Sequence, residues 1–123
     1  MTELTHYIDG KDVKGTSRRF ADVFNPATGE VQYKVPLASA GELAEAVEAA
    51  ERAQPAWAAV NPQRRARVMM KFVDLLNRDM EKLAEVLSRE HGKTIPDAKG
   101  DVQRGLEVVE YCIGAPQLSL IHI

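Results

Sequence analysis

Cys112 is the only cysteine in this 123-residue chain, and it is the first candidate for a catalytic nucleophile. A reactive thiolate needs a nearby cation, a base or the N-terminus of a helix. Cys112 instead falls near the C-terminal end of a predicted helix, where the helix dipole disfavours an anion. We therefore expect a packed, unreactive cysteine that behaves as a small hydrophobic residue.

The three histidines, His6, His91 and His122, are far apart in the sequence. No two of them have the close spacing of a metal-binding pair on one element. His91 falls in the last turn of a predicted helix, where a protonated imidazole suits the negative end of the dipole. The sequence therefore favours a structural role for His91 and predicts no metal site.

A local group of basic residues could bind an anion if its side chains converged. Arg64, Arg67 and Lys71 would share one helix face, with Arg65 beside them. Such runs more often form a solvated surface, and we favour that interpretation. Residues 90–94, Glu-His-Gly-Lys-Thr, lack the glycine spacing of a P-loop, and no Gly-x-Gly-x-x-Gly or Gly-x-Ser-x-Gly motif occurs. We assign no catalytic, cofactor-binding or metal-binding residue.

Composition places the chain among globular proteins of ordinary size. Its length suits one domain and not two, and a net charge of −2 gives no basic excess for nucleic acid or an anionic membrane. The N-terminus lacks the basic start and apolar stretch of a secretory signal, and no apolar run approaches the ~20 residues that span a bilayer. With one cysteine and no internal disulfide, we expect a reducing, cytoplasmic location.

The first part of the chain, residues 1–38, has the signals of strands and turns. Asp9-Gly10 is a favoured two-residue hairpin turn, and Asn25-Pro26-Ala27-Thr28-Gly29 has the residues of a second turn. Alternating or β-rich segments flank both turns, and residues 14–19 form a polar loop. The predicted strands are residues 5–8, 11–13, 20–24 and 31–35.

From Ser39 onward the hydrophobic period becomes helical. Ser39 and Glu42 fit a capping box, and we expect Pro55 to end this first helix or begin a short turn. Asn61-Pro62 predicts the start of a second helix, which breaks near residues 77–79.

Two further helices follow that break. Gly92 is a plausible end for the third, and Thr94 with Asp97 begins the fourth. Gly105 lies within the fourth helix at a cost of about 1 kcal/mol relative to alanine, which suggests close backbone packing there.

The apolar residues of each helix recur at helical spacing. In the second helix we expect a buried stripe of Val68, Phe72, Leu75 and Leu76, flanked by Met69. The third helix has Met80, Leu83, Ala84 and Leu87 on one face, and the stripe of the fourth consists of Ala98, Val102, Gly105, Leu106, Val109 and Ile113.

The architecture expected from these signals is an α/β fragment, a β-ribbon followed by about four amphipathic helices. We divide it into a β-ribbon segment (1–38), a helical segment (39–117) and a short tail (118–123). No β-α-β unit closes within the chain. A ribbon is marginal without a packing partner, so the helices suggest a missing sheet.

An ordered set of motifs resembles the opening of the aldehyde dehydrogenase superfamily. The set begins with Tyr-Ile-Asp-Gly-Lys at 7–11, Phe-Asn-Pro-Ala-Thr-Gly-Glu at 24–30 and Val35-Pro36. It continues through Trp57, the 64–68 and 75–76 segments, and Glu-His-Gly-Lys at 90–93. The resemblance covers residues 7 to about 117 and implies a Rossmann-related parent fold.

Residues 61–68 and 93–110 are similar to the CoA-acylating methylmalonate-semialdehyde dehydrogenases. That resemblance implies oxidation of methylmalonate or malonate semialdehyde to an acyl-CoA, with NAD as hydride acceptor and CoA as cosubstrate, in valine breakdown. It also implies a homo-oligomeric parent. The family's cysteine nucleophile and cofactor segments come later in the chain, so the resemblance transfers no such residue here, and Cys112 does not match the nucleophile's place.

The sequence departs from the family after Leu118, where Ser-Leu-Ile-His-Ile at 119–123 replaces the expected continuation. We expect a truncation or a foreign junction, and an inactive fragment. Two alternatives stay open, a fragment of a generic hydrolytic aldehyde dehydrogenase and a non-catalytic helical binding or assembly module.

Overall fold

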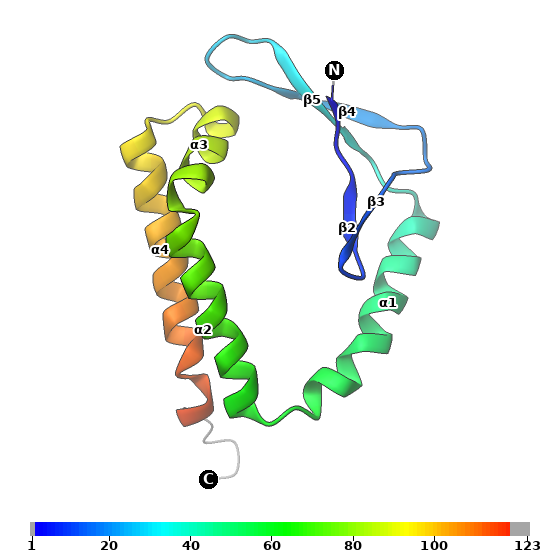
Figure 1. Cartoon of the computed structure of the whole chain (residues 1–123). Coiled ribbons are helices and arrows are strands. Elements are labelled where there is room, and N and C mark those ends of the chain that lie inside the picture. The colour runs from blue at the N-terminus through cyan, green and yellow to red at the C-terminus, as the bar shows by residue number, and fades with distance from the viewer. Residues whose placement is uncertain (1, 119–123) are drawn as a thin grey trace. The chain divides into compact units, whose positions relative to one another are not determined.

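A computed structural model describes residues 2–118 of the chain, which form five short strands followed by four helices (Figure 1). The elements make two compact units that divide between Ala59 and Val60, with the strands and the first helix in one and three helices in the other. The expected α/β class, strands first and then four helices, is confirmed. No helix among these residues is long and apolar enough to cross a membrane.

The strands form two small sheets in the first unit. Strands β2 (His6–Ile8) and β3 (Lys11–Val13) pair as an antiparallel hairpin, as predicted. Strand β5 (Val31–Pro36) is the centre of the other sheet, between β4 (Phe20–Phe24), which is antiparallel to it, and β1 (Thr2–Glu3), which is parallel. The sequence did not predict β1, because two polar residues carry no strand pattern.

Both predicted turns are confirmed by the backbone. Asp9 and Gly10 have φ of 54° and 73°, the two positive values that a tight hairpin turn requires. In the second turn the Asn25 side chain accepts a hydrogen bond from the Ala27 N–H at 3.0 Å. Gly29 supplies a φ of 75° and donates its N–H to the Asn25 carbonyl at 2.7 Å.

Helix α1 (Ala40–Ala58) begins at the predicted capping box. The Glu42 carboxylate accepts the Ser39 N–H at 2.7 Å, and the Ser39 hydroxyl accepts the Glu42 N–H at 3.2 Å. The second oxygen of Glu42 accepts the Thr16 N–H at 2.5 Å, so the same carboxylate also holds the loop before β4. Hydrogen bonds from the Ser39 and Thr16 backbones lower the pKa of Glu42 from 4.5 to about 2.

The polar loop at residues 14–19 is hydrogen-bonded to the segment that connects β5 and α1. The Ser17 hydroxyl donates to the Leu37 carbonyl at 2.5 Å, and the Arg19 guanidinium donates to the Ala38 carbonyl at 3.0 Å. Gly15 lies so close to Pro36 that an added Cβ would come within 2.6 Å of the proline Cβ. This loop and the Glu42 carboxylate together join α1 to the sheet.

Pro55 does not end the first helix, and that expectation is wrong. Helix α1 continues through Pro55 to Ala58, and the Pro55 carbonyl accepts the Ala59 N–H at 3.1 Å. Proline lacks one intrahelical hydrogen bond but can still accept others. The alanine-rich turns before it, and the residues after it, keep the helical path.

The second unit contains α2 (Pro62–Arg78), α3 (Met80–His91) and α4 (Ile95–Ile113), with a short 3-10 turn at Ala115–Gln117. The predicted boundaries are confirmed. The Asn61 side chain accepts the Gln63 N–H at 2.9 Å, Gly92 ends α3 with a φ of 83°, and the Thr94 hydroxyl accepts the Asp97 N–H at 3.4 Å. Helix α4 packs along both α2 and α3 (Figure 1).

The expected burial of the stripe on α2 is wrong for three of its four residues, whereas Ala84 of the α3 face and Ala98 and Leu106 of the α4 stripe are buried. Among the described residues the buried hydrophobic side chains are Ala49, Ala66, Ala84, Ala98 and Leu106, and Pro36 is buried as well. Val68 is 51% exposed, Phe72 43% and Leu75 46%. The stripes have the predicted helical spacing, but the three helices meet through alanines and leave the larger side chains uncovered.

Gly105 also differs from expectation. A Cβ added there would meet no atom within 4 Å, so none of the described residues packs closely against it. The proposed division at residues 38 and 117 stays a prediction. The predicted tail, apart from Leu118, lies outside the described residues.

The lowered pKa of Glu42 predicts an acid-sensitive joint between α1 and the sheet. A carboxyl group with a depressed folded-state pKa contributes stability above its unfolded pKa, and that contribution is lost as pH falls from about 4.5 towards 2. We expect Glu42→Gln to reduce stability at neutral pH and to flatten its acid dependence. Urea unfolding followed by circular dichroism at a series of pH values measures both effects.

Glu45→Gln is the matched control, since it removes an exposed carboxylate from the same helix. It should keep the acid dependence of the unaltered chain. Equal acid dependence in Glu42→Gln and the unaltered chain would contradict the assigned role of Glu42.

Candidate functional site

A group of charged side chains that the structure brings together lies at the start of α4. Asp101 forms an ion pair with Lys93, and its other carboxylate oxygen lies 2.5 Å from the Arg104 guanidinium. Asp97 accepts a hydrogen bond from the Thr94 hydroxyl at 2.9 Å. These residues line a hollow of about 320 Å³.

The charges in this hollow are matched within it. The hydrogen bond from Lys93 lowers the pKa of Asp101, with further attraction from Lys93, Arg104 and His91 against a smaller desolvation effect. Two cations, Lys93 and Arg104, face two carboxylates, Asp97 and Asp101. The positive and negative charges in the hollow therefore balance, which leaves no surplus charge for an anionic ligand.

The cluster instead fixes the turn between α3 and α4. The Ser88 hydroxyl of α3 donates to the Lys93 carbonyl at 2.7 Å, and Lys99 of α4 pairs with Glu81 of α3. Sequence reasoning noted Lys93 for its place beside Gly92 but missed Asp101. The two residues are eight positions apart on either side of a helix start, and no local sequence pattern predicts that they pair.

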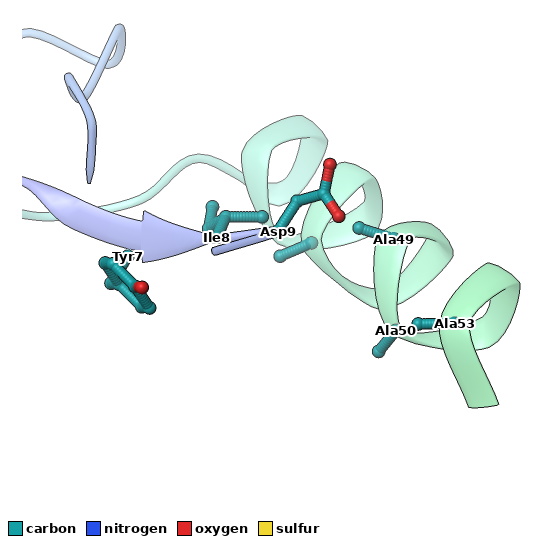
Figure 2. A pocket seen from close by; sticks show the side chains of 7 residues that line it. Tyr7, Ile8, Asp9, Ala49, Ala50 and Ala53 are labelled. Atoms are coloured by element: carbon teal, nitrogen blue, oxygen red, sulfur yellow. The ribbon is translucent and has the colours of Figure 1, made fainter. Parts of the chain in front are cut away.

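A second hollow lies between the β2–β3 hairpin and α1, with a volume of about 320 Å³ (Figure 2). Tyr7, Ile8 and Asp9 contribute one wall, and the small side chains of Ala46, Ala49, Ala50 and Ala53 contribute the other. Its one carboxylate, Asp9, lies 3.8 Å from Lys11 in an exposed ion pair. Tyr7 has the one other polar side chain among the lining residues, and the rest of the lining is apolar, so this hollow is a packing feature.

The histidines are not brought together. His6 lies in β2 with its Nε2 buried and without a hydrogen-bond partner among the described residues, and His91 is the exposed last residue of α3. The expected position of His91 at a helix C-terminus is confirmed, and His122 lies outside the described residues. Within residues 2–118 no group of His, Cys, Asp or Glu could hold a metal ion.

The basic group on α2 forms an exposed face, as favoured from the sequence. Arg64, Arg67 and Lys71 are all exposed. Arg65 is half-buried, and its Nε has no hydrogen-bond partner among the described residues. These side chains do not line any hollow described above.

Cys112 is exposed, so the expectation of a packed cysteine is wrong. It lies in the last turn of α4, where the sequence placed it, and the backbone there is the negative end of the helix dipole. The next residue, Ile113, is half-buried while Cys112 is exposed, because adjacent helical positions point about 100° apart.

A site for NAD or CoA does not fit the residues described here. Dinucleotides bind where a glycine-rich turn joins a strand to a helix N-terminus. In residues 2–118 the one strand that leads directly into a long helix, β5 into α1, does so through Leu37, Ala38 and Ser39 without a glycine. No step of a cofactor reaction can be derived from these side chains.

Comparison with known proteins supplies what the geometry does not. The model of the aldehyde dehydrogenase family matches residues 13–120. Malonate-semialdehyde dehydrogenase of Pseudomonas aeruginosa is 45% identical over 118 residues, which are 96% of this chain and 24% of that protein.

Solved structures agree with that match. A Sinorhizobium meliloti 1021 protein assigned as a methylmalonate-semialdehyde dehydrogenase, in complex with NAD, has a TM-score of 0.93 and 69% identity. Methylmalonate-semialdehyde dehydrogenase from Oceanimonas doudoroffii has a TM-score of 0.92 and 43% identity. Each match covers 96% of this chain and 24% of the other, so the chain spans about a quarter of the length of these relatives.

The position of Cys112 predicts a thiol that is accessible and structurally dispensable. We expect Ellman's reagent to modify it without denaturant, and Cys112→Ser to change the free energy of unfolding by less than about 0.5 kcal/mol, as is usual at an exposed site. A thiol that reacts only after urea is added would show that Cys112 is covered.

Proposed function

Because this chain belongs to the aldehyde dehydrogenase family, we propose that it is the N-terminal part of an NAD-dependent, CoA-acylating dehydrogenase of methylmalonate or malonate semialdehyde. The parent enzyme would convert the semialdehyde to an acyl-CoA in valine breakdown. It would act in the cytoplasm as a homo-oligomer.

The observation that carries this proposal is the agreement of sequence and structure across one subgroup. Relatives named as malonate- or methylmalonate-semialdehyde dehydrogenases reach 43% to 69% identity over almost the whole chain. Family members of other kinds are more distant, such as a benzaldehyde dehydrogenase of Corynebacterium glutamicum at 28% identity. The matched quarter contains no assigned catalytic residue, so it supports the subgroup through overall similarity and not through the active site.

The proposed cofactors also follow from the relatives of this chain. The Sinorhizobium meliloti relative was crystallised with NAD, which supports NAD for the parent of this chain. CoA follows from the proposed subgroup alone. Both would bind to residues beyond those described here, so we expect the 123-residue chain by itself to be inactive.

A non-catalytic module is the alternative from another class. A module that folds alone should bury its larger apolar side chains. Among the described residues the buried hydrophobic side chains are four alanines and Leu106, while seventeen large hydrophobic residues are exposed. That pattern favours a piece of a larger folding unit.

We expect the full-length gene product to form NADH from methylmalonate semialdehyde only when CoA is present, because CoA must release the acyl group. The measurement is NADH absorbance with and without CoA, with the 123-residue chain as the inactive control. Comparable turnover without CoA would instead support a hydrolytic aldehyde dehydrogenase. A coding sequence that stops after codon 123, with a sharp cooperative melt of the purified chain, would support the module.

A further inference from the structure

Helices α2, α3 and α4 line a third hollow, an apolar groove of about 500 Å³. Nine of its ten lining residues are apolar or glycine, and Glu90 is the one charged exception. Each helix contributes one wall, with Phe72 and Leu76 from α2, Leu83 and Val86 from α3, and Val109 from α4. We call this the α2–α4 groove.

Large side chains in the α2–α4 groove face water in this chain. Val86 is 55% exposed, and Phe72 and Leu83 are also exposed. Contiguous apolar surface of this kind marks a contact with another protein surface, because single exposed hydrophobic residues are ordinary but a lined groove is not. The composition of the groove indicates an apolar occupant.

Gly105 opens the wall of the groove down to the backbone. It lies in the interior of α4, where glycine is less favourable than alanine, and a Cβ there would meet nothing within 4 Å. An occupant could therefore approach the α4 backbone more closely at Gly105 than at any residue with a side chain.

The size of the relatives identifies the occupant. This chain matches 96% of its own length but 24% of the Sinorhizobium meliloti structure, with a TM-score of 0.93. The relative therefore contains the same helices, and about three quarters of its length lies outside the matching region. That further polypeptide is covalently attached to these helices, so its local concentration beside them exceeds that of any separate partner.

We propose that the α2–α4 groove is the docking surface for the part of the parent enzyme that follows residue 118, which packs an apolar face against it and approaches the backbone at Gly105. This inference rests on the proposed function only in taking the chain as part of a longer dehydrogenase. It assigns to these helices the role of an internal interface. A second copy of this chain in the groove is the outcome that the experiments below distinguish from it.

Thiol labelling tests whether the groove is covered in the full-length protein. The protein is the extended gene product, or the Sinorhizobium meliloti relative with residues 2–118 of this chain in place of its matching part. Val86→Cys places a thiol in the groove, and Glu85→Cys places one on the exposed surface of the same helix outside the groove. Both variants carry Cys112→Ser, and peptide mapping separates their labelling from that of other cysteines.

We expect the maleimide labelling rate at Val86→Cys to be at least about tenfold lower in the full-length protein than in the 123-residue chain, since a covered thiol reacts only after local opening. Glu85→Cys should label at similar rates in both. Equal rates at Val86→Cys in the two proteins would overturn the proposal. Protection already present in the 123-residue chain, and lost on dilution, would assign the groove to a second copy.

A glycine pair gives a second test that does not depend on labelling. Gly105→Leu fills the groove, whereas Gly100→Leu lies in the same helix outside it, and neither added Cβ meets an atom in this chain. In the full-length protein we expect Gly105→Leu alone to lower the melting temperature, by about 2 °C or more.

The same effect of both glycine variants in the full-length protein would contradict the proposal. Neither experiment uses catalysis. A full-length protein that protects Val86→Cys but fails to oxidise the semialdehyde would leave the docking surface standing and reject the proposed function. CoA-dependent activity together with an unprotected Val86→Cys would support the proposed function and reject the docking surface.

Discussion

The three-helix unit is limited by what its helices can bury against one another. Helices α2, α3 and α4 meet through Ala66, Ala84, Ala98 and Leu106, and small side chains contribute little apolar area at a contact. The larger residues of the same helices are displaced to the margins of those contacts. An unoccupied apolar groove is the direct consequence, and it separates this chain from a module that completes its own core.

Polar contacts in both units position backbone segments and supply no chemistry. Glu42 joins the N-terminus of α1 to the loop at Thr16, and Asp101 joins Lys93 to Arg104 at the turn between α3 and α4. Each carboxylate has its pKa lowered by partners that hold it ionised. Both carboxylates therefore hold neighbouring segments in place, which suits the scaffold role proposed for this chain.

Membership of the aldehyde dehydrogenase family gives these features a common meaning. The proposed parent enzyme needs no reactive group in this part, but it needs surfaces here that its remaining polypeptide can cover. The polar joints would keep the shape of such surfaces, and the apolar groove would provide one of them. Similarity to the semialdehyde dehydrogenases extends across almost the whole chain, so the scaffold itself carries the family signature.

The sequence by itself determined the features that arise from neighbouring residues. Four local signals produced the turn or helix end expected of them, because their side chains or φ angles act within one to four residues. They are Asp9-Gly10, Ser39 with Glu42, Asn61-Pro62 and Gly92. The helix periodicity and the absence of a motif for chemistry were also readable directly.

Only the tertiary structure decided which helical faces are covered and which charges meet. Phe72 and Leu75 have the spacing of core residues and are nevertheless exposed, since burial depends on a partner surface that no local pattern specifies. For the same reason the sequence could not foresee strand β1 beside β5, the pairing of Lys93 with Asp101, or the open space at Gly105. Pro55 shows that a local signal can also mislead. Proline usually ends a helix, but α1 continues through Pro55 because the turns on both sides of it are helical.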